Sequence, residues 1–171
     1  MSVIDRMPIP ASNFAAGRNG QQIDRVVLHT MVSWISSADA RFHDPASQVS
    51  AHFGVRIDGT LWQWVNTWDT AFHAGDLSVN YRSIGIEHED GGAPNDPRPD
   101  VLYARSSALV AQFCTENAIP CARGTGGPGI YDHRQIVATA CPDALDTDRI
   151  IWQAQALITA GKVNALLAGI P

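Results

Sequence analysis

Lysine is almost absent from this chain of 171 residues: 11 of its 12 basic side chains are arginine, and only Lys162 is lysine. A mechanism that needs a lysine must therefore use Lys162 or do without one. Acidic side chains outnumber basic ones, and the net charge is −5. Because binding to the phosphates of nucleic acids favours an excess of lysine and arginine, this balance argues against a nucleic-acid partner.

Long apolar runs are also lacking. No stretch approaches the roughly 20 apolar residues of a membrane-spanning helix, which argues against membrane insertion. The first ten residues contain Asp5, Arg6 and two prolines in place of an apolar segment. We therefore expect no signal peptide, and synthesis in the cytoplasm.

Cysteine is scarce, and its three copies cannot all pair within one chain. At least one thiol is therefore free or bound to a metal. Cys114 and Cys121 are close enough in sequence for a disulfide, but nothing in the pattern indicates one. We interpret them as two small buried residues.

Short apolar runs bounded by polar residues predict β-strands. The run at 25–30 places His29 at the carboxyl end of its strand, and a tight-turn signal at Asp58-Gly59 predicts a hairpin. The strands are expected at residues 25–30, 49–57, 60–65 and 83–88.

Helical periodicity predicts helices that alternate with these strands. Asp100 is a plausible N-cap for the longest of them, which Pro120 ends at the latest. The helices are expected at residues 36–44, from Asp100 and from Asp146 or Thr147, with a surface loop at 89–100 and a glycine-rich loop at 124–129. This mixture predicts a single α/β domain over residues 1–171, with a central mixed β-sheet flanked by helices.

Three residues suggest a metal site: His29, His133 and Cys141. Imidazole nitrogen and thiolate sulfur are ligands that zinc prefers, and three protein ligands leave a fourth position open for catalysis. Spacing alone does not establish such a site, because His133 and Cys141 are farther apart than the paired ligands of structural zinc sites. The alternative is a buried cysteine and two packed or surface histidines.

Five motifs in order carry a resemblance to a known family. Together they resemble the zinc-dependent N-acetylmuramoyl-L-alanine amidases of the type-2 amidase and peptidoglycan-recognition-protein superfamily, over about residues 25–142. The motifs are Val26-Val27-Leu28-His29-Thr30; Val49-Ser50-Ala51-His52-Phe53 with Asp58-Gly59-Thr60; Ala71-Phe72-His73-Ala74-Gly75; Asn80-Tyr81-Arg82-Ser83-Ile84-Gly85-Ile86-Glu87; and Asp132-His133-Arg134 with Thr139-Ala140-Cys141-Pro142.

The resemblance implies a groove that holds one Zn²⁺, with His29, His133 and Cys141 as ligands. It also implies that Glu87 is the catalytic base. Two positions depart from the family pattern. Thr139 stands where many relatives have a lysine aimed at the developing oxyanion, and Ala51 stands where others have a tyrosine. Thr139 offers only a neutral hydrogen bond in that role.

Further residues are candidates by their place in the motifs. The resemblance implies that His73 faces the substrate groove, where it contacts substrate or stabilises the oxyanion. We take His52, Asn80 and Trp34 as candidate substrate-binding residues. A packed role is the alternative for His52, and Asn80 is expected to position either a loop or the peptide stem. His43 and His88 are expected at the surface, and His88 is expected to point to the sheet face opposite Glu87.

The resemblance implies hydrolysis of the amide bond between N-acetylmuramic acid and L-alanine in peptidoglycan. The alternatives are a peptidoglycan-binding module without activity, a cysteine peptidase using Cys141, and a cytoplasmic muropeptide-recycling amidase. A phage endolysin, or its catalytic domain, is the role we expect. It would be made in the host cytoplasm and act on the bacterial cell wall as a monomer.

Overall fold

A mixed six-stranded sheet forms the centre of the computed structural model, which describes residues 3–161. Its strand order is β1-β5-β4-β7-β3-β8, and a separate antiparallel pair joins β2 to β6. The strands are β1 (Val3–Asp5), β2 (Phe14–Ala15), β3 (Arg25–Thr30), β4 (Phe53–Val55), β5 (Leu61–Gln63), β6 (Thr70–Ala71), β7 (Ser83–His88) and β8 (Gly129–Asp132).

Two parallel strands, β3 and β7, occupy the interior of this sheet. Both are buried over almost their whole length, which is typical of strands that are covered on both faces. β3 pairs in parallel with β7 and β8, and β7 pairs in parallel with β4. Because β4 and β5 are antiparallel, the sheet is mixed, as the sequence predicts.

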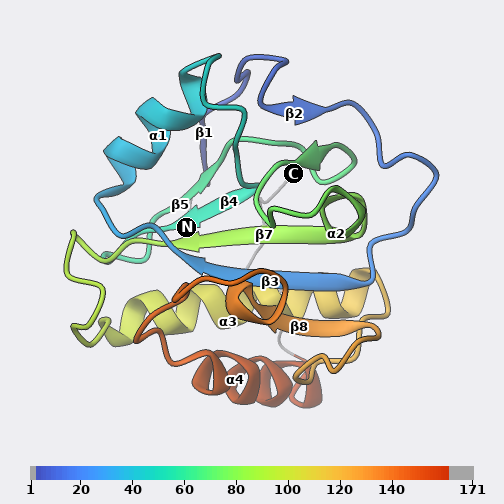
Figure 1. Cartoon of the computed structure of the whole chain (residues 1–171). Coiled ribbons are helices and arrows are strands. Elements are labelled where there is room, and N and C mark those ends of the chain that lie inside the picture. Colours follow the sequence, from blue (N-terminus) through green and yellow to red (C-terminus); the bar gives the residue numbers. More distant parts are fainter. Residues whose placement is uncertain (1–2, 162–171) are drawn as a thin grey trace.

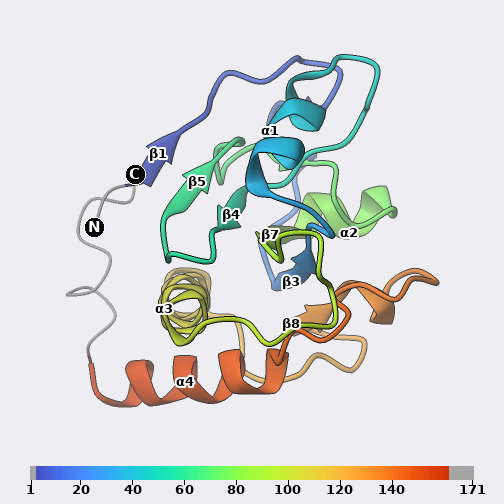
Figure 2. The same cartoon turned by 90° about the vertical axis from the view of Figure 1, so that its left-hand side faces the viewer.

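Helices cover both faces of the sheet (Figures 1 and 2). The long α3 packs on one face with α4 outside it, whereas α1 and α2 lie on the other. Their bounds are α1 (Ile35–His43), α2 (Leu77–Arg82), α3 (Asp100–Glu116) and α4 (Thr147–Thr159). None of the helices within residues 3–161 is long and apolar enough to cross a membrane.

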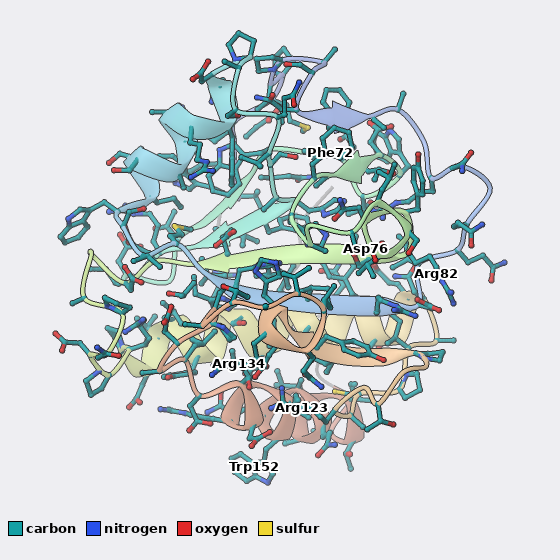
Figure 3. The ribbon with its side chains drawn as sticks, viewed as in Figure 1. Phe72, Asp76, Arg82, Arg123, Arg134 and Trp152 are labelled. Atoms are coloured by element: carbon teal, nitrogen blue, oxygen red, sulfur yellow. The ribbon has the colours of Figure 1, made fainter. Side chains whose placement is uncertain are left out.

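The main apolar core lies between the sheet and α3, with α4 packed outside. It includes Leu28 and Ile86 from the central strands, and Leu109 from α3. Arg123 joins the end of β8 to the start of α4, since its guanidinium binds Asp132 and the Thr147 hydroxyl (Figure 3). Trp152, by contrast, projects from α4 into solvent and is 67% exposed.

The predicted hairpin is present, but its first strand is shorter than expected. Only Phe53–Val55 is regular strand, because the chain before it pairs with two different partners: Ser50 N donates to Phe72 O, and His52 N donates to Gly85 O. The turn closes with a hydrogen bond from Arg56 N to Thr60 O, and Gly59 takes a φ of +79° there. A glycine is favoured at such a positive φ.

Two further expectations need correction. Asp100 is the first residue of α3, and Pro99 is its N-cap. His88 does point away from the Glu87 face, but it is fully buried and not on the surface. α3 covers that face of the sheet, and the His88 ring lies 2.7 Å from Ser106 Oγ of α3 and 2.7 Å from the His29 carbonyl oxygen.

The loop at 89–100 is more deeply anchored than a surface loop. Glu89 is 1% exposed, and its carboxylate accepts hydrogen bonds from Ile35 N at 2.9 Å and Ile57 N at 3.0 Å. The first of these bonds satisfies a free amide at the start of α1. Glu89 therefore ties α1 to the hairpin, and so holds one wall of the cavity described next.

Candidate active site

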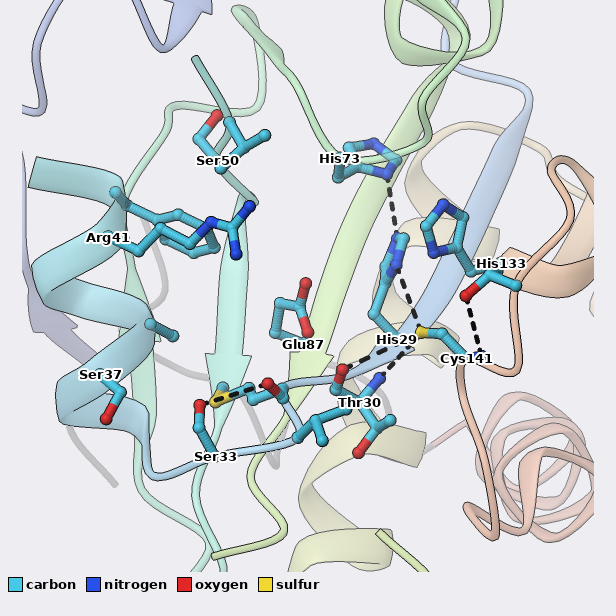
Figure 4. Close-up of a pocket in the computed structure, with 16 residues that line it drawn as sticks. His29, Thr30, Ser33, Ser37, Arg41, Ser50, His73, Glu87, His133 and Cys141 are labelled. Carbon is cyan, nitrogen blue, oxygen red and sulfur yellow. Dashed lines mark hydrogen bonds between the residues drawn. The ribbon is translucent and has the colours of Figure 1, made fainter. Parts of the chain in front are cut away.

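Parallel pairing brings His29 and Glu87 together at the carboxyl ends of β3 and β7. The two residues are register partners, so their side chains leave the sheet on the same face. His133 begins the short 3-10 helix His133–Gln135 directly after β8, and Cys141 follows in the next loop. Segments that are far apart in sequence thus meet at one end of the sheet (Figure 4).

These side chains open into a cavity of about 660 Å³ between the sheet end and α1. Figure 4 shows His29, His133 and Cys141 on one side, α1 on the other, and Glu87 between them. The lining residues are His29, Thr30, Met31, Val32, Ser33, Ser37, Ala38, Arg41, Phe42, Val49, Ser50, His73, Glu87, His133, Thr139 and Cys141.

The predicted metal ligands converge in this cavity. One donor atom from each of His29, His133 and Cys141 lies within 4.8 Å of the other two. Two imidazole nitrogens and one thiolate form a donor set suited to zinc. His133 Nε2 is buried without a hydrogen-bond partner among the described residues, as a nitrogen reserved for a metal would be.

A chain of hydrogen bonds sets the tautomer of His29. The Ser83 hydroxyl donates to Val79 O at 2.7 Å, so Ser83 Oγ accepts from His73 Nε2 at 3.1 Å. His73 Nδ1 is then unprotonated and accepts from His29 Nε2 at 3.1 Å. His29 Nδ1 keeps its lone pair and lies 3.9 Å from Cys141 Sγ, on the side of the predicted metal. His73 therefore orients a ligand, a role often filled by a hydrogen-bond partner of metal-bound histidine.

His133 is oriented in a similar way. Burial lowers the pKa of His133 below its usual value, and a hydrogen bond with the Ala74 backbone partly opposes this. A hydrogen bond that opposes this lowering favours the protonated imidazole of His133. A ring nitrogen therefore donates the bond, and the Ala74 carbonyl oxygen accepts it. Since Nε2 has no partner, the donor is Nδ1, which leaves the Nε2 lone pair free for a metal.

Asn80 holds the loop that makes both of these contacts. Its Oδ1 accepts from His73 N at 3.2 Å and from Ala74 N at 2.8 Å. Asn80 is 5% exposed and does not line the cavity, and its hydrogen bonds agree with loop positioning, one of the two roles that the sequence left open. It positions the loop that carries His73.

The surroundings of Cys141 disfavour its thiolate form unless a cation lies nearby. Thr30 N donates to its sulfur at 3.3 Å. Burial nevertheless raises the pKa of the Cys141 thiol to about 12, and the negative charge of Glu87 adds to the shift. Because a thiolate is the form that binds metals, a bound divalent cation would supply the missing charge.

Glu87 is partly buried, and its Oε2 has no hydrogen-bond partner within residues 3–161. Burial raises the pKa of Glu87 to about 8, the positive charge of Arg41 opposes this, and the charge of Asp90 adds to it. Burying a carboxylate oxygen without a hydrogen-bond partner destabilises the folded protein. Such an atom is expected where it takes part in a reaction. Here it lies in the cavity beside His29, where it can accept a proton from a reacting group.

The remaining predicted residues lie in different places. Thr139 is exposed at the cavity edge, and its Oγ1 accepts from Cys141 N at 3.2 Å, so its hydroxyl hydrogen is free to donate. Trp34 is 52% exposed beside Gly91, and it does not line the cavity. A substrate that extends beyond the cavity is needed to reach it.

His52 lies outside the cavity, behind His73. Its side chain is fully buried and does not line the cavity. Gly85 N donates to its Nδ1 at 3.0 Å, and its Nε2 lies 2.9 Å from the Arg18 guanidinium. His52 therefore packs behind His73, which is the alternative that the sequence left open.

Two residues of the site were not assigned a role from the sequence. Arg41 lines the cavity from α1, where a lone arginine on a helix looks like any solvated charge. Gly85 provides space: a Cβ at this position would lie 2.5 Å from His73 Cγ. Its place two residues before Glu87, on the same sheet face, is a signal that could have revealed it.

Comparison with known proteins agrees with this geometry. The family model described as N-acetylmuramoyl-L-alanine amidase matches residues 19–144. The curated protein N-acetylmuramoyl-L-alanine amidase A of Achromobacter lyticus is 33% identical over 131 residues, which cover 76% of this chain and 71% of that protein.

Solved structures share the fold at lower identity. A mutant endolysin from Bacillus subtilis superposes with a TM-score of 0.70 at 22% identity, covering 90% of this chain and 99% of that one. A selenomethionine derivative of AmpD superposes with a TM-score of 0.72 at 20% identity, covering 89% and 94%.

The substitution Gly85→Ala tests the support of His29 by His73. The added methyl group collides with the His73 ring, so we expect zinc affinity to fall by about 10- to 100-fold, as is usual when a partner of a metal ligand is displaced. Competition with a chromogenic chelator measures this affinity. Gly127→Ala is the matched control, because nothing lies within 4 Å of a Cβ there. Equal zinc affinities in the two variants would contradict the role of His73.

Proposed function

The chain belongs to the N-acetylmuramoyl-L-alanine amidase family, and on this premise we propose that it hydrolyses the amide bond between N-acetylmuramic acid and L-alanine with a zinc ion at His29, His133 and Cys141. One observation carries the proposal: two imidazole nitrogens and a thiol converge in the same cavity as a carboxylate oxygen that has no hydrogen-bond partner within residues 3–161. All of these groups come from one chain, so a monomer suffices.

Zn²⁺ in this site supplies a Lewis acid that activates water at neutral pH and polarises a carbonyl group. Each ligand is prepared by the protein. His29 and His133 are neutral and turned by hydrogen bonds from their other nitrogens, and Thr30 N supports the sulfur of Cys141. Such preparation fixes which atoms bind the ion.

Glu87 moves the proton in this proposal. Its Oε2 accepts a proton from the attacking water and delivers it to the amide nitrogen of L-alanine, which then leaves as an amine. The atoms balance: one water is consumed, and a carboxylic acid and an amine are formed, which at neutral pH become a carboxylate and an ammonium ion. The position of Glu87 between α1 and the ligand residues suits this transfer (Figure 4).

The oxyanion must be stabilised here without a lysine or a tyrosine. Ala51 is fully buried, and Lys162 lies outside the described residues. Thr139 has a free hydroxyl hydrogen at the cavity edge, and we assign it the neutral hydrogen bond to the oxyanion. His73 is left out of this role because both of its ring nitrogens are engaged with His29 and Ser83.

A cysteine-peptidase mechanism is disfavoured by the same cavity. An activated cysteine needs a lowered thiol pKa and a histidine that accepts its proton. Burial instead raises the pKa of Cys141 to about 12. Burial also lowers the pKa of His29, its nearest imidazole, well below the usual value.

The substitution Glu87→Gln separates proton transfer from metal binding. It keeps the shape of the side chain and removes the base, so kcat should fall by about 100- to 10,000-fold. Zinc content, measured by atomic emission, should stay that of the unmodified protein. Glu116→Gln changes an exposed glutamate at the end of α3 and serves as the control. Undiminished turnover in Glu87→Gln would exclude the role.

The biological role we propose is degradation of intact cell walls, as a phage endolysin or the catalytic domain of one. The recycling of soluble muropeptides is the other role that this chemistry allows. A comparison of the two substrates decides: an endolysin clears intact walls and releases new amino termini from them. Activity confined to soluble anhydro-muropeptides would overturn the endolysin role and leave the amidase chemistry intact.

A further inference from the structure

Arg41 differs from every other arginine of the chain. The guanidinium groups of the other ten arginines each make at least one hydrogen bond or ion pair. That of Arg41 makes neither with any residue between 3 and 161. An arginine without a partner on an open surface is unremarkable, but this one lines the active-site cavity.

The position of Arg41 is fixed by the fold. It lies in the last turn of α1, whose first turn is held by the Glu89 carboxylate, and α1 packs through Phe42 and Ala38. Figure 4 shows the Arg41 side chain reaching from α1 across the cavity toward Glu87, opposite the histidines and the cysteine. It stays exposed, so a ligand in the cavity can reach it.

The surroundings of Arg41 favour an anionic ligand with two oxygens. Arginine is the one cavity-lining residue type here that is charged at every working pH. Ser37 lies four residues earlier, on the same face of α1, and also lines the cavity. The guanidinium of Arg41 can bind a planar carboxylate through two parallel hydrogen bonds.

The substrate of the proposed reaction provides such a group. The stem peptide begins at the scissile bond and carries carboxyl groups, which are free in some cell walls and amidated in others. The net charge of the chain is −5, so a carboxylate would be repelled on average and needs a local positive charge to bind. Arg41 is that charge.

We propose that Arg41 binds a carboxylate of the stem peptide and makes the amidase prefer substrates in which this carboxyl group is free. The inference rests on the amidase function proposed above. It assigns Arg41 a part in substrate choice, whereas Glu87 and the ligand residues carry out the reaction.

Three soluble muropeptides test the proposal: one with all carboxyl groups free, one amidated at the second residue of the stem, and one amidated at the third. The amidation that weakens kcat/KM identifies the carboxylate. We expect the unmodified enzyme to favour its free form by about 10- to 100-fold, the range for a charge-assisted hydrogen bond. The substitution Arg41→Gln should bring this ratio close to one, mainly through KM, and Arg41→Lys should restore part of it.

Arg149→Gln is the matched control, because it removes an arginine of α4 that pairs with Asp100 outside the cavity. Its preference should equal that of the unmodified enzyme. A preference that survives Arg41→Gln would overturn the proposal, as would an unmodified enzyme that treats all three muropeptides alike. Equal loss on all three, through kcat, would show instead that Arg41 acts only on the charge of Glu87.

Calorimetric binding of the same muropeptides makes the comparison without turnover. The zinc-loaded Glu87→Gln protein and the Glu87→Gln, Arg41→Gln double variant are used. A carboxylate preference in Kd that disappears in the double variant supports Arg41. If the unmodified enzyme hydrolyses no muropeptide, the proposed function fails, and this binding result still decides the role of Arg41.

Discussion

The register between β3 and β7 is the constraint on which the rest of the site depends. It places His29 opposite Glu87 and Val27 opposite Gly85. Because side chains alternate along a strand, a slip of one strand by one residue would turn its functional group toward the opposite, apolar face and separate His29 from Glu87. Leu28 and Ile86, the neighbours that would replace them, are fully buried and hold this register.

Around His29 and Glu87, hydrogen bonds between polar groups fix the orientation of the histidines. Ser83 fixes His73, and His73 fixes His29, while Asn80 holds the loop whose Ala74 carbonyl fixes His133. Burial lowers the pKa of all three histidines, so they are neutral at physiological pH. Burial disfavours the charged forms of Cys141 and Glu87, and a bound divalent cation would stabilise them.

Much of this arrangement could be predicted from the sequence. The strands at 25–30 and 83–88 are confirmed residue for residue, because the first is a short, sharply bounded apolar run and the second alternates. β8 and α2 were missed, since one has four residues and the other six, too few for a clear period. The convergence of His29, His133 and Cys141 was predicted from the family resemblance, because the spacing of these residues in the sequence does not establish a metal site.

The incorrect predictions concern the burial of side chains, which the sequence of a single strand or helix does not determine. His88 was placed on the correct sheet face, but only the packing of α3 shows that this face is closed. His52 faces Arg18, a residue 34 positions away that no local pattern links to it. Arg41 became informative for the opposite reason: its lack of a partner is visible only once the partners of the other arginines are known.

The central claim is that His29, His133 and Cys141 together hold one zinc ion. Zinc K-edge X-ray absorption of the protein loaded with an equimolar amount of Zn²⁺ tests it most directly. The account predicts one sulfur at about 2.3 Å and the remaining ligands at about 2.0 to 2.1 Å, as nitrogen or oxygen. A shell without sulfur, or a protein that fails to retain stoichiometric zinc, would contradict it.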